Sequence, residues 1–355
     1  MVDVFVSEFA KLVLQNPLAE EKVSQKRKMF SYKLMDSQQA RAFTTELHDR
    51  HIEIHLSDIS AVSVRGEKNL KPSHCVLPFK YLQYADRIRN LTVYKDDVWV
   101  VTFPKCGTTW TQEMVWLIDH DLDYETAGKV DLSRRTVFIE ASAVIGDYLG
   151  DTVGAVENLA RPRHIKSHLP LALLPQQLWT VQPKIIYCAR NPKDAAVSYM
   201  HHYRHLHGFQ GTNETFLEGL LTDQILWCPQ VPHTLDFWNV RHLDYVMFNH
   251  FEDMKKDIMG ILRKTCSFFG KSYTDKQLAK LAEHLSFDTM KKNPSANQTQ
   301  LLKTLETVRN TKINFNFMRK GQLGCYKDEL TPEFTQRLQE HVDKQLAGSG
   351  FQYME

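Results

Sequence analysis

The alternation of short apolar runs with helical patterns restricts what this chain can fold into more than any other feature. The run DVWVVTF, residues 97–103, precedes the helical pattern TTWTQEMVWLIDH, and KIIYCAR, residues 184–190, precedes KDAAVSYMHHYRHL. Their valines and isoleucines do not alternate with polar residues, as is typical of strands buried on both faces. We therefore predict a single-domain α/β fold with a central, mostly parallel sheet flanked by helices.

Composition limits the classes of partner. A chain of 355 residues with 43% hydrophobic and 24% charged residues can bury an ample core. The formal net charge of +2, without a long Lys/Arg block, argues against a nucleic-acid partner. No window reaches the roughly 18 apolar residues of a membrane span, so we expect a cytoplasmic protein without a membrane partner. Residues 1–28 are expected to be a helical or flexible extension, and residues 29–355 the domain.

The six cysteines indicate free thiols. They are scattered along the chain without a CxxC pair, which argues against a zinc site and against a disulfide framework. We therefore expect reduced cysteines, as in a reducing compartment.

The segment PKCGTTW after the first apolar run is suited to bind an anion. Thr108 and Thr109 are good residues to begin a helix, Gly107 permits close approach of a ligand, and Lys105 adds positive charge. A Walker A loop has its lysine after the second glycine, whereas Lys105 precedes Gly107 by two residues. An ordinary strand-to-helix turn remains the alternative, because Pro, Gly and Thr are common turn residues.

A second candidate site follows the second apolar run. Asn191 and Pro192 have the sequence of a helix N-cap and first residue, which places Arg190 at a strand end and Ser198 about two turns into the helix. An arginine there can bind a phosphate through two hydrogen bonds, or it can form a surface ion pair. Ligands of such sheets lie beyond the carboxyl ends of the strands, where both candidates fall.

Two further segments carry suitable chemistry. If RPRHIKSHLPLALLP is extended, Lys166 and His168 project from one face and Ser167 from the other. A histidine that takes a proton beside a charge-balancing lysine can serve a transfer reaction, although any one of sixteen histidines is a weak candidate. In NFMRKGQLGCY, Arg319 and Lys320 precede two glycines, as in a phosphate-binding loop or a merely solvated one.

Six motifs, in chain order, resemble those of the cytosolic sulfotransferase family: TFPKCGTTW, KSHLPLALLP, ARNPKDAAVSY, FEDMKKD, LSFDTMKKNP and FMRKGQLG. The stretch WLIDHDLDYETA resembles the arthropod branch. The resemblance covers residue 29 to the C-terminus and implies a layered architecture like that of P-loop kinases, with a 5′-phosphosulfate-binding loop. It implies transfer of a sulfuryl group from 3′-phosphoadenosine 5′-phosphosulfate (PAPS), which leaves 3′-phosphoadenosine 5′-phosphate (PAP), without a metal. The acceptor would be a hydroxyl or amine of a small, largely apolar molecule such as a phenol, a steroid-like alcohol or a catecholamine.

The resemblance also assigns the cofactor contacts to two groups of residues. The 5′-phosphosulfate loop would comprise Lys105, Cys106, Gly107, Thr108, Thr109 and Trp110, with Trp110 against the adenine. The 3′-phosphate would lie against Arg190, Ser198 and the loop Phe317, Met318, Arg319, Lys320 and Gly321, with Ser286 and Phe287 near the nucleotide.

By the same resemblance, His168 is the general base that takes the proton of the attacking acceptor. Lys105 would stabilise charge on the leaving phosphate, Lys166 would support the sulfuryl group, and Ser198 would restrain Lys105. The acceptor would contact His168 and two further residues, Phe138 and His202.

Some positions depart from the family pattern. Phe251 and Leu285 replace a tyrosine and a threonine of the family, which removes two polar contacts on the adenine side. A homodimer through the segment from Lys327 to Gln336 is an expectation weakened by Pro332 and Gln336, which replace the valine and glutamate of the dimer signature. Two alternatives remain: a PAPS-dependent dehydratase of a retinoid-like allylic alcohol through a transient sulfate ester, and a nucleotide-binding protein without catalysis.

Overall fold

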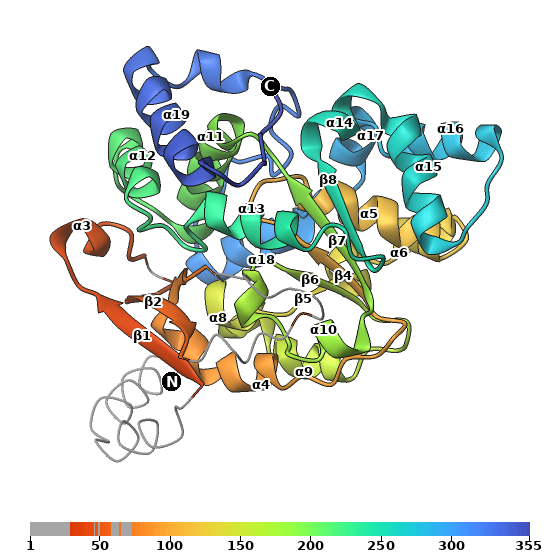
Figure 1. The fold of residues 1–355 in the computed structure, drawn as a ribbon, viewed down its shortest axis with the longest axis horizontal. Coiled ribbons are helices and arrows are strands. Elements are labelled where there is room, and N and C mark those ends of the chain that lie inside the picture. Colours follow the sequence, from red (N-terminus) through yellow and green to blue (C-terminus); the bar gives the residue numbers. More distant parts are fainter. Residues whose placement is uncertain (1–28, 46, 49, 58–63, 65–72) are drawn as a thin grey trace.

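The central element of the fold is a sheet of five parallel strands in the order β5, β6, β4, β7, β8 (Figure 1). The computed structural model describes residues 29–45, 47–48, 50–57, 64 and 73–355, so the expected extension at residues 1–28 lies outside the described part. The strands are β4 Val98–Val101, β5 Val137–Phe138, β6 His164–Ser167, β7 Lys184–Ala189 and β8 Val246–His250.

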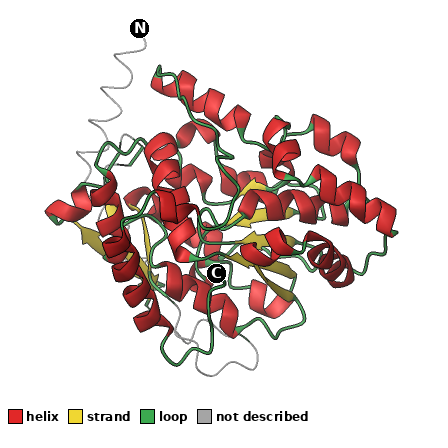
Figure 2. Ribbon diagram, turned by 90° about the horizontal axis from the view of Figure 1, so that it is seen from above, coloured by secondary structure: helices red, strands yellow, loops and turns green. Residues whose placement is uncertain are grey.

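Helices surround this sheet, as Figure 2 shows from above. Their N-terminal signals match those of the sequence: α5 begins at Thr108, and Asn191 caps the helix that begins at Pro192. The helices are α3 Gln38–Arg41, α4 Ala85–Arg89, α5 Thr108–Asp119, α6 Tyr124–Lys129, α7 Leu132–Arg135, α8 Ala141–Val144, α9 Thr152–Glu157, α10 Leu178–Val181, α11 Pro192–His202, α12 Asn213–Leu221, α13 Gln230–Asn239, α14 Phe251–Lys256, α15 Ile258–Phe269, α16 Asp275–His284, α17 Phe287–Lys292, α18 Thr299–Arg309 and α19 Pro332–Leu346. Short turns are η2 Phe79–Gln83, η3 Asp147–Leu149, η4 Leu171–Leu173, the π-helical η5 Tyr203–His207 and η6 Cys325–Asp328.

The central sheet is buried on both faces, as the unbroken apolar runs predict. Trp99 and Val101 of β4 belong to one hydrophobic core, together with residues of α11, α13 and α19. Val98 and Val100 belong to a second core, together with residues of α5, α15 and α16. Because successive side chains of a strand point to opposite faces, each face of β4 requires its own apolar cover. The predicted single-domain α/β architecture with a parallel sheet is therefore confirmed.

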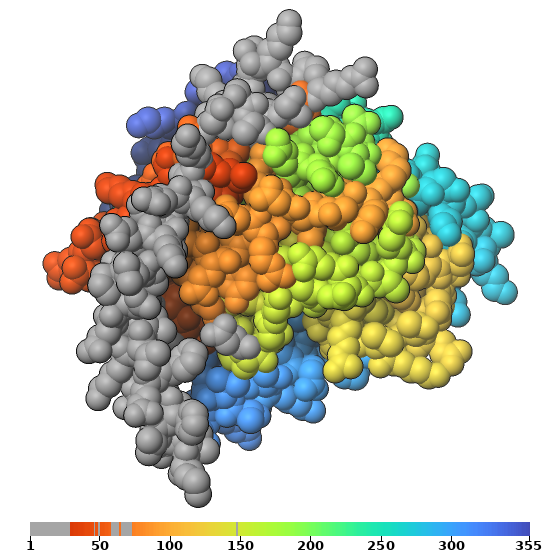
Figure 3. Space-filling model, turned by 90° about the horizontal axis from the view of Figure 1, so that it is seen from below, coloured from red at the N-terminus to blue at the C-terminus, as the bar shows by residue number. Residues whose placement is uncertain are grey.

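A second, smaller sheet was not predicted. It is antiparallel and contains β1 Phe30–Met35, β2 His51–Leu56 and β3 Cys75–Pro78. The alternating sequence HIEIHL of β2 is a strand signal, and its isoleucines Ile52 and Ile54 are buried in the core that contains Trp99. In the view from below, the segments that contain α4, α9 and α10 lie side by side on the surface (Figure 3).

The strand register brings three loops to one edge of the central sheet. Val101 of β4 lies opposite Ser167 of β6 and Tyr187 of β7, so these three parallel strands run in step toward their carboxyl ends. The segments that follow them carry Lys105, His168 and Arg190. The sheet therefore gathers residues that are far apart in the sequence, at the edge where ligands of such folds lie.

Two expectations from composition concern the whole molecule. All six cysteines are described, and each is buried and free of a disulfide bond. Within the described residues, the helices are all too short or too polar to cross a membrane.

Candidate active site

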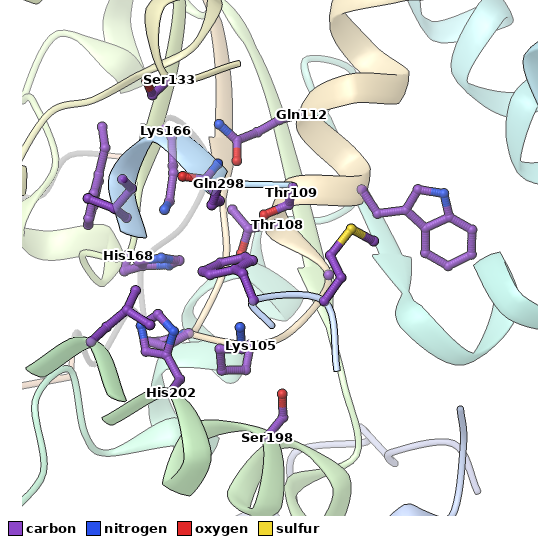
Figure 4. A pocket seen from close by; sticks show the side chains of 18 of the residues that line it. Lys105, Thr108, Thr109, Gln112, Ser133, Lys166, His168, Ser198, His202 and Gln298 are labelled. Carbon is purple, nitrogen blue, oxygen red and sulfur yellow. The ribbon is translucent and has the colours of Figure 1, made fainter. Parts of the chain in front are cut away.

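A cavity of about 560 Å³ opens at the carboxyl edge of the central sheet (Figure 4). Its walls come from the loops after β4, β6 and β7, from α18, and from the segment of residues 317–322. Most of the site residues expected from the sequence line this cavity: Lys105, Gly107, Thr108, Thr109, Trp110, Phe138, Lys166, His168, Arg190, Ser198, His202, Phe287, Phe317, Met318, Arg319, Lys320 and Gly321.

Cys106 and Ser286 do not line it. Cys106 is buried and its thiol contacts the carbonyl oxygen of Pro104, whereas Ser286 caps α17 by accepting a hydrogen bond from the N–H of Thr289. Leu285, one of the departures from the family pattern, does line the cavity.

The loop before α5 has a backbone conformation that few residues adopt. Gly107, the N-cap of α5, has a φ of +91°, and a Cβ atom at this position would lie 2.8 Å from the ring of Phe251. Lys105 also has a positive φ, +65°, which is uncommon outside glycine. This loop and the first residues of α5, Thr108 and Thr109, line the cavity, as an anion cradle requires.

Positive side chains gather around this loop. Burial and the nearby cations Lys166, Arg190 and Arg319 lower the pKa of Lys105 to about 7. Its Nζ lies 4.0 Å from the centre of the Phe317 ring, which stabilises the charged form through a cation–π contact. Because these neighbouring cations disfavour the charged form of Lys105, an anion bound beside it would raise its pKa.

Arg190 links this loop to the edge of the next strand. Its guanidinium donates to the carbonyl oxygen of Lys105 over 3.0 Å and lies 4.3 Å above the ring of Phe251. Its Nε is buried without a hydrogen-bond partner among the described residues. Phe251, which replaces a family tyrosine, thus packs against Arg190 and also against Trp110, with 5.6 Å between the two ring centres.

His168 is held in one tautomer. Its Nδ1 lies 2.7 Å from the carbonyl oxygen of Thr102, and because a carbonyl only accepts, Nδ1 carries the hydrogen. The lone pair is therefore on Nε2. Burial, and then the charge of Lys166, hold the pKa of His168 well below its usual range, so the imidazole is neutral and able to accept a proton.

Glu140 is a site residue that the sequence analysis missed. Its carboxylate accepts one hydrogen bond from Ser167 Oγ over 2.9 Å and one from the backbone N–H of His168 over 2.6 Å. Burial raises the pKa of Glu140, and the charge of Lys166 opposes this shift. Burial lowers the pKa of Lys166, and the charge of Glu140 opposes that shift. As expected from an extended segment, Ser167 points away from the cavity that Lys166 and His168 line.

A second missed residue, Glu329, contacts the basic side chains of the segment of residues 317–322. Its carboxylate forms an ion pair with Arg319, contacts His201 Nε2 over 2.5 Å, and lies 3.3 Å from Lys320 Nζ. The glycine of this loop, Gly321, has a φ of +61°, and a Cβ atom there would lie 2.2 Å from the ring of Phe287. Arg319 and Lys320, which line the cavity, therefore already have a carboxylate partner.

Metal-ligating side chains gather elsewhere. In the described part of the chain, Asp119, His120 and His164 form the one group that could hold a metal ion, and Asp119 and His164 are joined by a hydrogen bond of 2.8 Å. None of the three lines the cavity. The expectation that the site works without a metal stays a prediction.

Fold and site together define a class of enzyme. Several cations and a neutral histidine line one cavity at the carboxyl edge of a parallel sheet, an arrangement that suits an enzyme transferring an anionic group between two bound molecules.

Comparisons with known proteins give the family. The family sequence model of the sulfotransferase domain matches residues 95–350 of this chain. Luciferin sulfotransferase of Photinus pyralis is 33% identical over 290 residues, 78% of this chain and 78% of that protein. Sulfotransferase 1A1 of Mus musculus is 32% identical over 289 residues, 81% of this chain and 97% of that protein. A solved structure of retinol dehydratase in a complex with retinol and PAP superposes with a TM-score of 0.77 and 25% identity, over 92% of this chain and 99% of that chain.

The chain therefore belongs to the sulfotransferase family. It is a PAPS-dependent sulfotransferase that acts on small acceptors.

Proposed function

We propose that this chain moves the sulfuryl group of PAPS directly to a hydroxyl or amine of a small, largely apolar acceptor, with His168 as the general base. The observation that carries this proposal is the tautomer of His168, which leaves a lone pair on Nε2 inside a cavity lined by Lys105 and Lys166. When bound, PAPS supplies the sulfuryl group that the acceptor receives. Nε2 accepts the proton of the acceptor oxygen as the new bond forms.

The residues around the cavity fit PAPS as two separate anion sites. The N–H groups and hydroxyls at the start of α5 would hold the 5′ end, with Lys105 on the leaving phosphate and Lys166 beside the sulfuryl group. The 3′-phosphate would lie against Arg190, Arg319 and Lys320. The buried Nε of Arg190, which has no hydrogen-bond partner in the described part of the chain, and the positive φ of Gly321 support this second site. Ser198, whose hydroxyl faces the cavity from α11, would restrain Lys105 (Figure 4).

The test combines binding and transfer. Calorimetric titration with PAP, with AMP as the control, asks whether the 3′-phosphate is recognised; we expect a strong preference for PAP. Transfer of radiolabelled sulfate from PAPS to a panel of phenols and alcohols should then disappear in His168→Ala. Transfer that persists in this variant would contradict the role of His168, and equal binding of PAP and AMP would contradict the second anion site.

A dehydratase remains a second candidate. The superposition on retinol dehydratase, over 92% of this chain, favours it. In such a reaction the enzyme would sulfate an allylic alcohol and the ester would then lose sulfate. Net formation of a dehydrated product from retinol and PAPS, without accumulation of a sulfate ester, would support this candidate; a stable sulfate ester would exclude it.

We also infer three finer properties. The chain would work in the cytoplasm. It would belong to the arthropod branch of the family, which its similarity to a Photinus pyralis enzyme supports. It would form a homodimer through the segment from Lys327 to Gln336. In that segment Thr331 and Pro332 begin α19, with Thr331 accepting a hydrogen bond from the N–H of Phe334. Sedimentation of the wild type against a Lys327→Glu variant tests the dimer. Removal of residues 1–28 should leave PAP binding intact if the domain begins near residue 29.

A further inference from the structure

A π-helical turn in the cavity wall brings two histidines together. Helix α11 ends at His202 and continues as the π-helical turn η5, in which the N–H of Gly208 donates to the carbonyl oxygen of Tyr203, five residues earlier. Residues five apart lie on different sides of an α-helix, but a π-helical turn places them nearly above one another. The rings of His202 and His207 are accordingly 5.5 Å apart, centre to centre. Such turns are frequent at functional sites.

Both imidazoles have an unused nitrogen. The Nδ1 atoms of His202 and His207 are buried, and neither has a hydrogen-bond partner among the described residues. Both side chains line the cavity, and Figure 4 shows His202 on the same side of it as His168. A buried polar atom without a partner costs free energy, so a ligand group that pairs with these nitrogens would offset that cost.

The rings are neutral, and their surroundings are apolar or positive. Burial holds the pKa of each imidazole well below its usual range; the nearby Lys105 contributes at His202, and the neighbouring His48 at His207. Phe138, Leu206 and Trp227 line the same cavity, and the ring centre of Trp227 is 6.0 Å from that of His207. A positively charged group of a ligand would therefore be repelled, whereas a neutral polar group on an apolar framework would fit.

We propose that His202 and His207 form a polar corner of the acceptor site that binds a second hydroxyl of the acceptor, so that the preferred acceptors are apolar molecules with two hydroxyls. The proposal rests on the sulfuryl-transfer function above for the identity of the cavity. A hydroxyl suits the corner because it both donates and accepts, and thus pairs with Nδ1 in either tautomer. A catecholamine fits less well, since Lys105 and Lys166 would repel its ammonium group.

The inference is tested with matched pairs of phenols bound to the complex of the enzyme with PAP. Each pair consists of a 4-(hydroxyalkyl)phenol and the 4-alkylphenol in which a methyl group replaces the terminal hydroxyl, with chains from one to six carbons. At the chain length that reaches the corner, the hydroxyl compound should bind about tenfold or more tightly than its partner, because a site built for a hydroxyl penalises its absence. Titration calorimetry measures this ratio without turnover.

Variants assign the effect to the two histidines. His202→Phe and His207→Phe should reduce the ratio to about threefold or less, whereas His207→Gln should retain part of it. His205→Phe is the matched control, because His205 is on the same turn but does not line the cavity; its ring stacks on Phe315.

Three results would overturn the polar corner: equal affinity within every pair, absence of binding by every hydroxyalkyl phenol, or a preference that survives both Phe variants. A pair that shows the preference but is never sulfated would instead count against the proposed function, so the two failures are distinguishable.

Discussion

The Nδ1–H of His168 donates to the backbone carbonyl oxygen of Thr102 over 2.7 Å, and the hydroxyl of the same Thr102 lies 2.6 Å from that of Thr108. Thr102 thus connects the histidine with the first residue of the helix behind the anion-binding loop. The carbonyl oxygen of His168 in turn accepts from His233 Nε2 over 3.0 Å. Main chain and ring are both fixed, so the proton-accepting nitrogen keeps its position relative to the loop.

This arrangement predicts the effect of His168→Gln. The variant keeps a polar side chain but has no nitrogen that can accept the proton, so kcat should fall between about 100-fold and 10,000-fold. PAP affinity should change little, since the cations that bind the phosphates remain. Initial-rate kinetics and PAP titration check this, with His205→Gln as the control. Equal losses in PAP binding and kcat would show that His168 supports the cofactor rather than the proton transfer.

Glu140 is expected to act through its neighbours. The carboxylate of Glu140 accepts from two donors, Ser167 Oγ and the N–H of His168, one at each oxygen. The amide of Glu140→Gln has only one oxygen, so one of these two hydrogen bonds is lost. Lys166 also loses its buried counter-charge, which makes its protonated form less favourable. We expect kcat to fall by about 10- to 100-fold.

Two controls separate positioning from general damage. The KM for PAPS should change less than kcat, and the kcat of Glu140→Gln should begin to fall at a lower pH than that of the wild type as Lys166 loses its proton. A drop in the melting temperature with an unaltered pH profile would indicate a structural role alone.

Local signals account for what the sequence could predict. The buried strands β4 and β7, the start of α5 at Thr108 and the cap at Asn191 follow from patterns within short stretches of sequence. Parallel strands gather their carboxyl ends, so the placement of Lys105 and Arg190 at one edge followed as well. The place of His168 beside them came only from the family resemblance. The small antiparallel sheet was missed although β2 alternates in the expected way.

Other features depend on contacts that no local pattern carries. Glu140 meets His168 across 28 residues of chain, and nothing in RRTVFIEAS distinguishes it from a surface carboxylate. Glu329 follows Asp328 just before a helix, where acidic residues are common for local reasons. The π-helical turn at 203–207 continues an ordinary helical pattern. Its stabilisation includes Arg309, which donates to the carbonyl oxygens of His205 and Leu206 from a distant helix.

The depressed pKa of Lys105 predicts that PAP binding depends on pH. The free lysine titrates at about 7 and a bound phosphate raises its pKa, so binding is strongest below pH 7 and is lost as pH rises toward the raised value. Between pH 7.5 and 9 the Kd should rise roughly tenfold. Calorimetry in buffers of different ionisation enthalpy should show proton uptake. In Lys105→Met the uptake should diminish and the Kd should depend less on pH; a wild-type Kd that is constant over this range would contradict the assignment.

Glu329 is expected to weaken the binding of the 3′-phosphate. Its carboxylate pairs with Arg319 and lies 3.3 Å from Lys320, so a phosphate that binds these cations must compete with it. Glu329→Gln removes the Coulomb repulsion between this carboxylate and the bound phosphate in a partly solvated site. The Kd for PAP should therefore fall by roughly tenfold. AMP binding should be unaffected because AMP lacks the 3′-phosphate. Asp328→Asn is the matched control: Asp328 is exposed and 3.4 Å from Lys320, so its charge is screened by solvent. Weaker PAP binding in Glu329→Gln would mean the opposite, that Glu329 holds Arg319 in position for the phosphate.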